Sequence, residues 1–334
     1  MTTIEDKNDP KENIVTLSRR ARSLLRQRDF IGAEKLFLEG LDIEPENVYL
    51  LVGIGDTHRQ RNRFNEAIQY YEKAIEHEPN NIFALRGAGD CFRGLRNPSR
   101  SIYFWQKYLE NNAKDYQVIV RIGDGYKKLN EFDLAEKHYL EALALCPTDR
   151  FALFGIGELK YKKNELEEAL KYFEKLLSIE TKHIHVLTMA GNASRRLKQY
   201  EKGCQFYQMT LKLDPNNTFA LYGLGDCIRG LGKISEAIDW WLKLLDLDPK
   251  NQSVLSRIGD SYIKLGNYEL AINYYKQCLS IGYNTYAHLG LATLYKNENK
   301  LEQSMLEINK ILTIDPENER ATAFLESLSE NSTN

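Results

Sequence analysis

Small and aromatic residues recur along the chain with a spacing of 34 residues. Glycine marks this period at Gly55, Gly89, Gly123, Gly157, Gly191, Gly225 and Gly259. Twelve positions after each glycine stands a small residue: Ala67, Ser101, Ala135, Ala169, Gly203, Ala237 and Ala271. Four positions later stands an aromatic residue: Tyr71, Trp105, Tyr139, Phe173, Tyr207, Trp241 and Tyr275. The hydrophobic positions around these markers have helical spacing, which predicts two amphipathic helices of about 12 to 14 residues in each period.

The recurring residues have a common packing reason. Glycine in the first helix and a small residue in the second let the two backbones approach closely, and the aromatic ring fills the space beside that contact. Proline lacks an N–H group and cannot continue a helix, so it ends many of the second helices. These prolines are Pro45, Pro79, Pro147, Pro215, Pro249 and Pro316.

A small residue at position 8, alanine at 20, an aromatic at 24 and proline at 32 of a 34-residue repeat resembles the tetratricopeptide repeat. In this phase nine repeats begin at residues 14, 48, 82, 116, 150, 184, 218, 252 and 285 and continue to residue 318. The departures are Ser101 and Gly203 in place of alanine, and Ala113, Thr181 and Tyr283 in place of proline. The resemblance implies an all-α fold, a right-handed α-α superhelix of helix-turn-helix repeats. We expect a capping helix over residues 319–328 and disordered polar ends at residues 1–13 and 329–334.

A longer period of 136 residues, or four repeats, is superimposed on the first. The segment 79–95 recurs closely at 215–231, and the segment 121–129 recurs at 257–265. One interpretation is the duplication of a four-repeat segment. The other is that an elongated partner contacts the same surface twice.

Composition narrows the class of protein. The 45 lysine and arginine residues nearly balance the 47 aspartate and glutamate residues, so the net charge of −2 gives no overall attraction to nucleic acid or membrane. No apolar run reaches the roughly 18 residues that a membrane-spanning helix needs. The polar start has no apolar core of a signal peptide. We therefore expect a cytoplasmic protein without direct membrane insertion, and its oligomeric state does not follow from the sequence.

Candidate catalytic and metal-binding groups are sparse. The five cysteines are far apart and form no CxxC pair, which disfavours a disulfide framework or a zinc module. They are Cys91, Cys146, Cys204, Cys227 and Cys278. The Gly-x-Gly stretches lie inside predicted helices without a preceding strand, so they are not a nucleotide-binding fingerprint. His183 and His185 lie two residues apart at a helix start, on different faces. We therefore expect no enzyme, no metal and no cofactor.

The resemblance implies that positions 2, 5, 6, 9, 12 and 13 of each first helix line an inner groove. Four repeats have an aromatic residue at position 2 and glycine at position 6: Tyr49 with Gly53, Phe83 with Gly87, Phe151 with Gly155, and Phe219 with Gly223. Larger residues stand at position 6 of repeats 4, 6 and 8, namely Arg121, Met189 and Arg257, while Arg86 and Tyr222 occupy position 5 of repeats 3 and 7. A glycine beside an aromatic ring would form a pocket for a partner. Alternatively, the aromatic rings pack on the preceding second helix.

Charged and amide residues alternate along the same face. Position 9 holds Asp56, Asp90, Asp124, Glu158, Asn192, Asp226 and Asp260, and position 12 holds Arg59, Arg93, Lys127, Arg195 and Arg229. Within one helix such pairs contribute only about 0.2–0.5 kcal/mol each. The ladder is therefore better suited to binding a partner's backbone or charged side chains, and the alternative is a solvated face.

The first repeat is strongly basic. Arg19, Arg22 and Arg26 fall at groove positions 6, 9 and 13, which favours a partner segment with an acidic end near this repeat. The patch is short and has no interleaved aromatic residues, so we do not expect nucleic acid. The acids at position 9 depart from the carboxylate clamp of the chaperone-binding members of the family.

The sequence thus predicts a non-catalytic scaffold or adaptor that binds an extended or helical segment of a partner protein in its groove. One alternative is a building block of a larger assembly, such as a cell-envelope or motility machine. Another is a regulatory arm of an enzyme acting in trans, resembling that of O-linked N-acetylglucosamine transferases.

Overall fold

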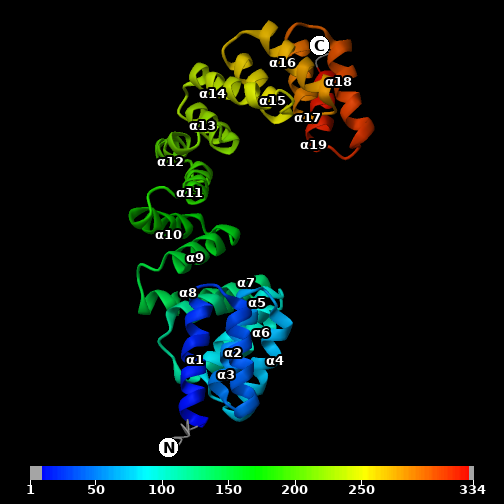
Figure 1. Cartoon of the computed structure of the whole chain (residues 1–334). Helices are drawn as coiled ribbons and strands as arrows, with labels where there is room; N and C mark the ends of the chain where they lie inside the picture. The colour runs from blue at the N-terminus through cyan, green and yellow to red at the C-terminus, as the bar shows by residue number, and fades with distance from the viewer. Residues whose placement is uncertain (1–9, 331–334) are drawn as a thin grey trace, which may run out of the picture. The chain divides into compact units, whose positions relative to one another are not determined.

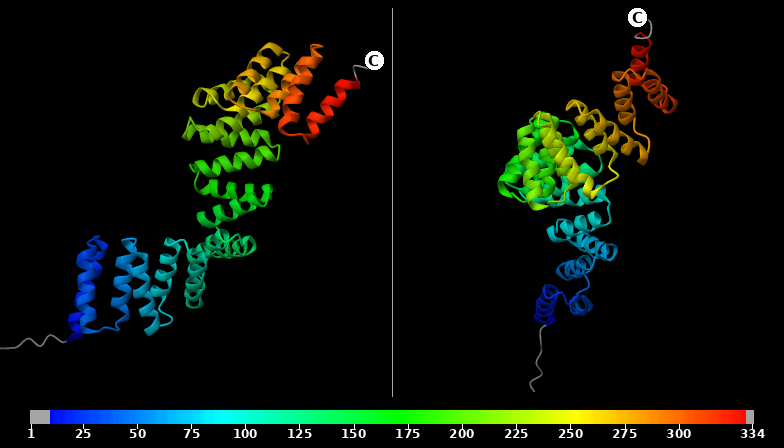
Figure 2. Two further views of the ribbon diagram at one scale, coloured as in Figure 1. Left: turned by 90° about the vertical axis from the view of Figure 1, so that its right-hand side faces the viewer. Right: turned by 90° about the horizontal axis from the view of Figure 1, so that it is seen from above.

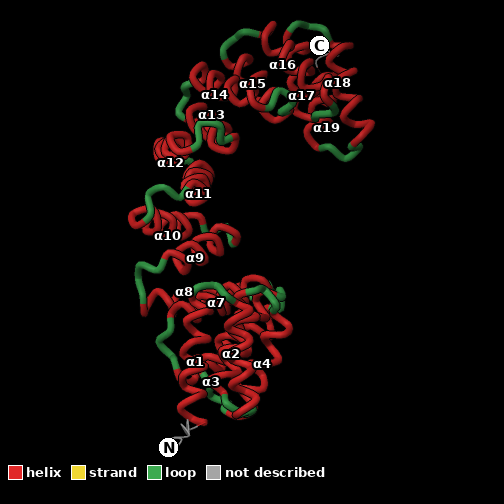
Figure 3. The backbone as a smooth tube through the Cα atoms, in the orientation of Figure 1, coloured by secondary structure: helices red, strands yellow, loops and turns green. Residues whose placement is uncertain are grey.

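The computed structural model describes residues 10–330. In this range the chain forms α-helices joined by short turns, without a strand (Figures 1 and 3). The helices are α1 (Pro10–Arg26), α2 (Phe30–Ile43), α3 (Val48–Gln60), α4 (Phe64–His77), α5 (Ile82–Gly94), α6 (Pro98–Asn111), α7 (Tyr116–Lys128), α8 (Phe132–Leu145), α9 (Arg150–Lys162), α10 (Leu166–Ile179), α11 (Ile184–Arg196), α12 (Tyr200–Leu213), α13 (Thr218–Gly230), α14 (Ile234–Leu247), α15 (Gln252–Lys264), α16 (Tyr268–Ile281), α17 (Thr285–Asn297), α18 (Leu301–Ile314) and α19 (Glu319–Glu330). The expected all-α fold of tandem helix pairs is confirmed.

Local capping explains where the first helices begin. In repeats 2 to 9 the first helix begins at the first residue of the repeat. In most of them the preceding asparagine or aspartate accepts a hydrogen bond from the backbone N–H three residues further on, which satisfies one of the free donors of the first turn. These caps are Asn47, Asn81, Asp115, Asp149, Asn217, Asn251 and Asn284.

The two ends of the described range differ from expectation. Helix α1 begins at Pro10, so residues 10–13 belong to a helix and not to a disordered terminus. Proline is favoured in the first turn, where its missing N–H group is not needed. Helix α19 continues to Glu330, two residues beyond the expected 328, because neither glycine nor proline interrupts it. The expected disordered residues 1–9 and 331–334 lie outside the described residues.

Each repeat turns from its first to its second helix through position 15. In every repeat of the described range this residue has a positive φ, a conformation that glycine and asparagine adopt most easily. The residues are Arg28, Asn62, Arg96, Asn130, Asn164, Lys198, Gly232, Gly266 and Asn299. Arginine and lysine at three of these turns are therefore unusual choices.

The chain divides into two compact units, residues 1–163 and 164–334. In the N-terminal unit the first helices of successive repeats contact one another, as α1 does α3, α3 does α5, and α7 does α9. In the C-terminal unit α11 contacts α13, and α15 contacts α17. Figure 2 shows the helices of each unit stacked side by side. Positions 2, 6, 9 and 12 of neighbouring repeats are thereby brought onto one surface within each unit.

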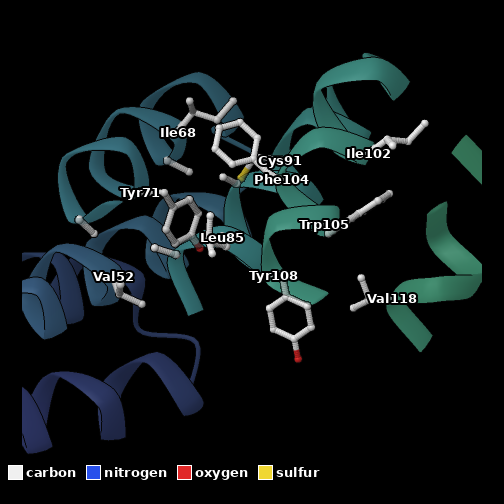
Figure 4. Packing of buried hydrophobic residues seen from close by; sticks show 14 of the residues in the cluster. Val52, Ile68, Tyr71, Leu85, Cys91, Ile102, Phe104, Trp105, Tyr108 and Val118 are labelled. Atoms are coloured by element: carbon white, nitrogen blue, oxygen red, sulfur yellow. The ribbon is translucent and has the colours of Figure 1, made fainter. Parts of the chain in front are cut away.

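The core of each unit is built around the aromatic residue at position 24. In the N-terminal unit Tyr71 and Trp105 are buried with Leu85, Cys91 and other apolar side chains (Figure 4). In the C-terminal unit Tyr207, Trp241 and Tyr275 have the same role, and α19 buries Ala321 and Leu328 at the end of the stack. Burying one such side chain contributes about 1.5–3 kcal/mol.

Candidate partner-binding surface

The residue at position 24 decides which partner the side chain at position 9 has. Where position 24 is tyrosine, its hydroxyl donates a hydrogen bond to the carboxylate or amide oxygen at position 9 of the same repeat. The pairs are Tyr71 with Asp56 (2.8 Å), Tyr139 with Asp124 (2.6 Å), Tyr207 with Asn192 (2.8 Å) and Tyr275 with Asp260 (2.5 Å). In these even-numbered repeats, position 9 therefore ties the first helix to the second.

The same ring also determines position 6 of the following repeat. A Cβ atom added to Gly155 would lie 2.5 Å from Cζ of Tyr139, so only glycine fits there without a shift of the ring. The same contact pairs Phe37 with Gly53, Tyr71 with Gly87, and Tyr207 with Gly223. The space beside these glycines is thus filled by the preceding repeat, and the expected pocket for a partner does not form. That expectation was wrong because the pattern shows a small residue without showing which neighbour requires it.

Repeats 3 and 7 have tryptophan at position 24, and both contacts change. Trp105 and Trp241 have no hydroxyl. The indole of each packs against the glycine at position 8 of its own repeat, as the tyrosine rings also do, but it faces no glycine at position 6 of the following repeat. Position 6 of the following repeat then holds a large side chain, Arg121 or Arg257. Tryptophan in place of tyrosine at position 24 is therefore accompanied by arginine in place of glycine at position 6 of the next repeat.

In the N-terminal unit, Asp90 is surrounded by arginines from three successive first helices. Nη1 of Arg121 lies 2.7 Å from Oδ1 of Asp90, and Nη2 of Arg93 lies 3.9 Å from the same oxygen. Nη1 of Arg59 lies 4.0 Å from Oδ2. The carboxylate thus links helices α3, α5 and α7.

In the C-terminal unit, Asp226 has the same surroundings. Nη1 of Arg195 lies 2.8 Å from Oδ2 of Asp226, while Arg257 and Arg229 lie 3.0 Å and 3.5 Å from Oδ1. The Asp226 side chain is only 5% exposed. Nε of Arg257 also donates a hydrogen bond to the hydroxyl of Tyr222 at 2.6 Å.

These two groups, which we call the Asp90 cluster and the Asp226 cluster, are copies separated by the 136-residue period. In both, the shortest contact joins different repeats, and the contact within one helix is longer. Arg59 and Asp56, 3.0 Å apart, do form the expected pair within a helix. The carboxylates are largely occupied inside the protein, so it is the arginines that present charge to the surface.

The remaining groove candidates have varied surroundings. Nζ of Lys127 lies 2.8 Å from Glu158 of the next repeat and 3.8 Å from Asp124. Arg86 lies 3.5 Å from the capping residue Asp115. Met189 is half-buried in α11.

The aromatic side chains at position 2 are largely exposed. The exposed fraction is 47% for Tyr49, 65% for Phe83, 60% for Phe151 and 73% for Phe219. Tyr286 at position 2 of repeat 9, which is not among the predicted groove residues, is 60% exposed. These rings therefore do not pack into the core, in contrast to the buried aromatics at position 24.

The three arginines of the first repeat line one cavity of about 410 Å³ together with Tyr49. Cζ of Arg22 lies 4.1 Å from the centre of the Tyr49 ring, close enough for a cation–π contact. Within residues 10–330, Arg19, Arg22 and Arg26 form no ion pair, and no carboxylate lines the cavity. This pocket is therefore positively charged.

Burial controls the protonation of the hydrogen-bonded pairs. Burial, together with the adjacent carboxylate, raises the pKa of the hydroxyl groups of Tyr71, Tyr139 and Tyr275, so these hydroxyls remain donors. Burial also raises the pKa of Asp260, although the hydrogen bond from Tyr275 and the nearby arginines offset part of this effect. The sequence did not lead us to expect hydrogen bonds between the tyrosines at position 24 and the residues at position 9. The sequence feature that accompanies these hydrogen bonds is a glycine at position 6 of the repeat that follows each tyrosine.

Two negative observations apply to residues 10–330. No group of three or more histidine, cysteine, aspartate or glutamate side chains is placed to hold a metal ion. None of the helices in this range is both long and apolar enough to span a bilayer.

Three models of the tetratricopeptide repeat match the chain, at residues 48–81, at 120–181, and at 253–281 with 285–318. No curated protein sequence matches it. Among solved structures, the TPR protein YrrB, described as having an unusual peptide-binding site, has 24% identity and a TM-score of 0.52, covering 55% of this chain and 95% of YrrB. The C-terminal part of a TPR repeat-containing protein of Cytophaga hutchinsonii has 19% identity and a TM-score of 0.53, covering 82% and 99%.

Another similar structure is pilF of Pseudomonas aeruginosa, with 20% identity and a TM-score of 0.50, covering 64% of this chain and 99% of pilF. At these identities, the structural likeness concerns the fold alone. The matching repeat models, the 34-residue period and the tandem helix pairs all agree: the chain belongs to the tetratricopeptide repeat proteins.

Proposed function

We propose that this protein is a non-catalytic interaction scaffold that binds an extended segment of another protein along its first helices. The exposed aromatic side chains at position 2 carry this proposal. Tyr49, Phe83 and Phe151 keep much of their ring surface in water, although the aromatics at position 24 are buried. Exposed aromatic residues at a repeated position are typical anchors of a protein interface.

The stacked repeats favour an extended partner. Most first helices of neighbouring repeats contact one another within each unit, and ion pairs join α5 to α7 and α13 to α15, so they offer a long surface that is formed before binding. Binding to such a surface costs little ordering of the scaffold itself. A peptide-binding site in YrrB, which has the same fold, is consistent with this kind of ligand.

The cavity of the first repeat favours an acidic end on the partner segment. Arg22 is held against Tyr49, and Arg19 and Arg26 lie beside it without an internal carboxylate among the described residues. Arginine binds carboxylates through charge-assisted hydrogen bonds. We therefore place an acidic side chain or chain terminus of the partner in this cavity.

The test compares two double variants of the full chain in affinity purification with quantitative mass spectrometry. In Phe83→Ala with Phe151→Ala, we expect selective loss of proteins that the unchanged chain captures. The matched control is Leu134→Ala with Leu140→Ala, which removes two partly exposed apolar side chains from the second helix α8. Equal capture by all three proteins would contradict the proposal.

Two further measurements complete this test. The melting temperature of the phenylalanine variant should stay close to that of the unchanged chain, because the removed rings are exposed. Light scattering should show a monomer for the unchanged chain. A defined oligomer that the phenylalanine substitutions dissociate would instead favour the building block of a larger assembly.

A further inference from the structure

A second cavity of the N-terminal unit is lined mainly by positively charged side chains. It has a volume of about 480 Å³ and lies among helices α5, α6 and α7. Four cationic groups line it together with one carboxylate and one indole: Arg93, Arg96, Arg121, Lys128, Asp124 and Trp105. The cavity is large enough for a phosphate or carboxylate group with part of its side chain.

The positive charge of this cavity is only partly neutralised by the protein. Arg96 and Lys128 form no ion pair with any residue that the structure describes, and Arg93 is 3.9 Å from its nearest carboxylate oxygen, on Asp90. The one carboxylate in the lining, Asp124, already accepts a hydrogen bond from Tyr139 at 2.6 Å. An excess of cations therefore faces the cavity.

Arg121 shows the electrostatic consequence of this crowding. Burial lowers the pKa of Arg121, and the nearby guanidinium groups of Arg93 and Arg86 lower it further, although Asp90 acts in the opposite direction. A bound anion would relieve the repulsion around Arg121.

An adjoining cavity adds an apolar contact. It has a volume of about 350 Å³ and shares Arg93, Arg121 and Asp124 with the cationic cavity. Phe151, one of the exposed aromatic residues at position 2, also lines it, together with Val120 and the carboxylate of Asp149. The two cavities together fit a ligand with a negative group next to an apolar side chain.

Arg96 has an unusual backbone conformation for its residue type. Arg96 occupies the turn at position 15 with φ of 57°, where other repeats have mostly asparagine or glycine. An arginine in this conformation is less favourable than either. Its side chain lines the cationic cavity.

We propose that this cavity binds an oxyanion, a phosphate or a carboxylate, on a side chain of the partner segment, with an apolar neighbouring side chain against Phe151. The inference rests on the proposed function in taking the ligand to be an extended peptide. Arginine and lysine side chains around one small volume suit such a group, and the guanidinium groups bind it with two parallel hydrogen bonds. Binding should weaken as salt is added.

The 136-residue copy offers an internal comparison. In the second copy, Arg229, Arg257 and Lys264 stand at the positions of Arg93, Arg121 and Lys128. Gly232 stands where the first copy has Arg96. The second copy therefore lacks the counterpart of Arg96, one of the two cations that form no ion pair in the first copy. Lys264→Gln is thus the matched control for Lys128→Gln.

The experiment measures fluorescence anisotropy of three labelled peptides with the full chain. The peptides are Gly-Ser-X-Leu-Gly-Ser, in which X is phosphoserine, glutamate or serine. We expect the chain to bind at least one charged peptide and to bind the serine peptide at least about tenfold more weakly, as the loss of charge-assisted hydrogen bonds implies. Binding of both charged peptides indicates that a carboxylate suffices, whereas binding of the phosphoserine peptide alone indicates a phosphate site.

Four variants locate the site. Arg96→Asn and Lys128→Gln should each weaken the binding of the charged peptide roughly three- to tenfold, while Lys264→Gln should not. Arg96→Asn is expected to fold well, because asparagine stands at the same turn in repeats 2, 4, 5 and 9. Arg22→Gln removes a cation of the first-repeat cavity, so an effect of this variant alone would place the charged peptide in that cavity instead.

The result can separate this inference from the proposed function. Equal binding of the serine peptide, absence of binding by both charged peptides, or an equal effect of Lys264→Gln and Lys128→Gln would overturn the cationic site. Loss of binding in Arg22→Gln but not in Arg96→Asn or Lys128→Gln would also overturn it, while supporting the first-repeat pocket. The proposed function itself depends on Phe83 and Phe151, and its capture experiment does not use these variants.

Discussion

Arg121 of helix α7 and Asp90 of helix α5 form an ion pair across two successive repeats, with Nη1 2.7 Å from Oδ1. This contact accompanies tryptophan at position 24 of repeat 3. Where that position holds tyrosine, as at Tyr139, the hydroxyl binds the acid of its own repeat and the ring covers a glycine of the next. The aromatic residue thus determines whether an acid at position 9 connects two helices of one repeat or the first helices of several.

The Asp226 cluster predicts a stabilising role for its carboxylate. Asp226→Ala leaves Arg195, Arg229 and Arg257 without their shared partner, and should lower the free energy of unfolding by about 2 kcal/mol, since the arginines are partly exposed. Urea denaturation followed by circular dichroism measures this change. Asp239→Ala, which removes an exposed charge from helix α14, should change the free energy by less than about 0.5 kcal/mol. Equal effects of the two variants would show that the cluster contributes nothing.

The contact between Tyr139 and Gly155 predicts that even one methyl group is harmful there. Gly155→Ala places a Cβ atom 2.5 Å from the ring, and should destabilise the protein by about 1–3 kcal/mol. The control is a double-mutant cycle with Tyr139→Leu, measured by urea denaturation. With the ring removed, the alanine should cost much less than it does in the unchanged protein. Additive effects would mean that the ring is not the obstacle.

The half-buried carboxyl group of Asp260 predicts that the variant Asp260→Asn is more stable than the unchanged protein, by an amount that depends on pH. Its pKa is raised in the folded state, so its favourable contribution is present at low pH and is lost as the pH rises through the folded pKa. Asp260→Asn keeps an acceptor for Tyr275, as Asn192 does for Tyr207, without a buried charge. The variant should therefore melt at a higher temperature than the unchanged protein at pH 7.

Melting curves between pH 3 and pH 7 test this prediction, and the difference should shrink towards the acidic end. Asp56→Asn is the matched control, because Asp56 pairs with Arg59 at 3.0 Å and should gain nothing from neutralisation. A less stable Asp260→Asn at pH 7 would show that Arg229 and Arg257 outweigh the effect of burial.

The cysteines predict a simple pattern of thiol reactivity. Cys146 is half-buried, whereas the other four are buried. Burial raises the pKa of Cys91 to about 12 and that of Cys278 to about 11, which leaves little reactive thiolate at pH 8. The hydrogen bond with Cys227 lowers the pKa of Cys204, but burial keeps the reagent away from this thiol. Titration with a disulfide reagent should show one fast thiol in the native protein and five in urea. Cys146→Ser should remove the fast phase, and a second fast thiol would reveal local opening.

The helices were predictable because each depends on residues close in sequence. Asn47 and Asn81 cap helices that begin one residue later, and the glycine and aromatic markers recur with the same spacing. The resemblance then indicated which helices stack. Only the terminal repeats, where the regular neighbours are missing, had different boundaries.

The polar surface was harder to predict because its contacts cross repeats. Asp90 and Arg93 are three residues apart, but the closest cation to Asp90 is Arg121, which only the stacking of α5 on α7 brings near. The sequence pattern favoured aspartates that bind a partner, whereas Asp226 is almost completely enclosed. The exposure of Phe83 could not be predicted either, because an apolar residue at position 2 can face a neighbouring helix or water.

The matching of each ring to the residue it meets in the next repeat also limits how such a chain can evolve. Deleting repeat 3 would bring the ring of Tyr71 against Arg121, where glycine is required. Deleting repeats 3 and 4 together would bring Tyr71 against Gly155, which is compatible. Copying or losing repeats should therefore preserve the fold only when the ring at position 24 again meets a residue at position 6 that fits it. A duplication of four repeats keeps all such pairs inside the copied segment.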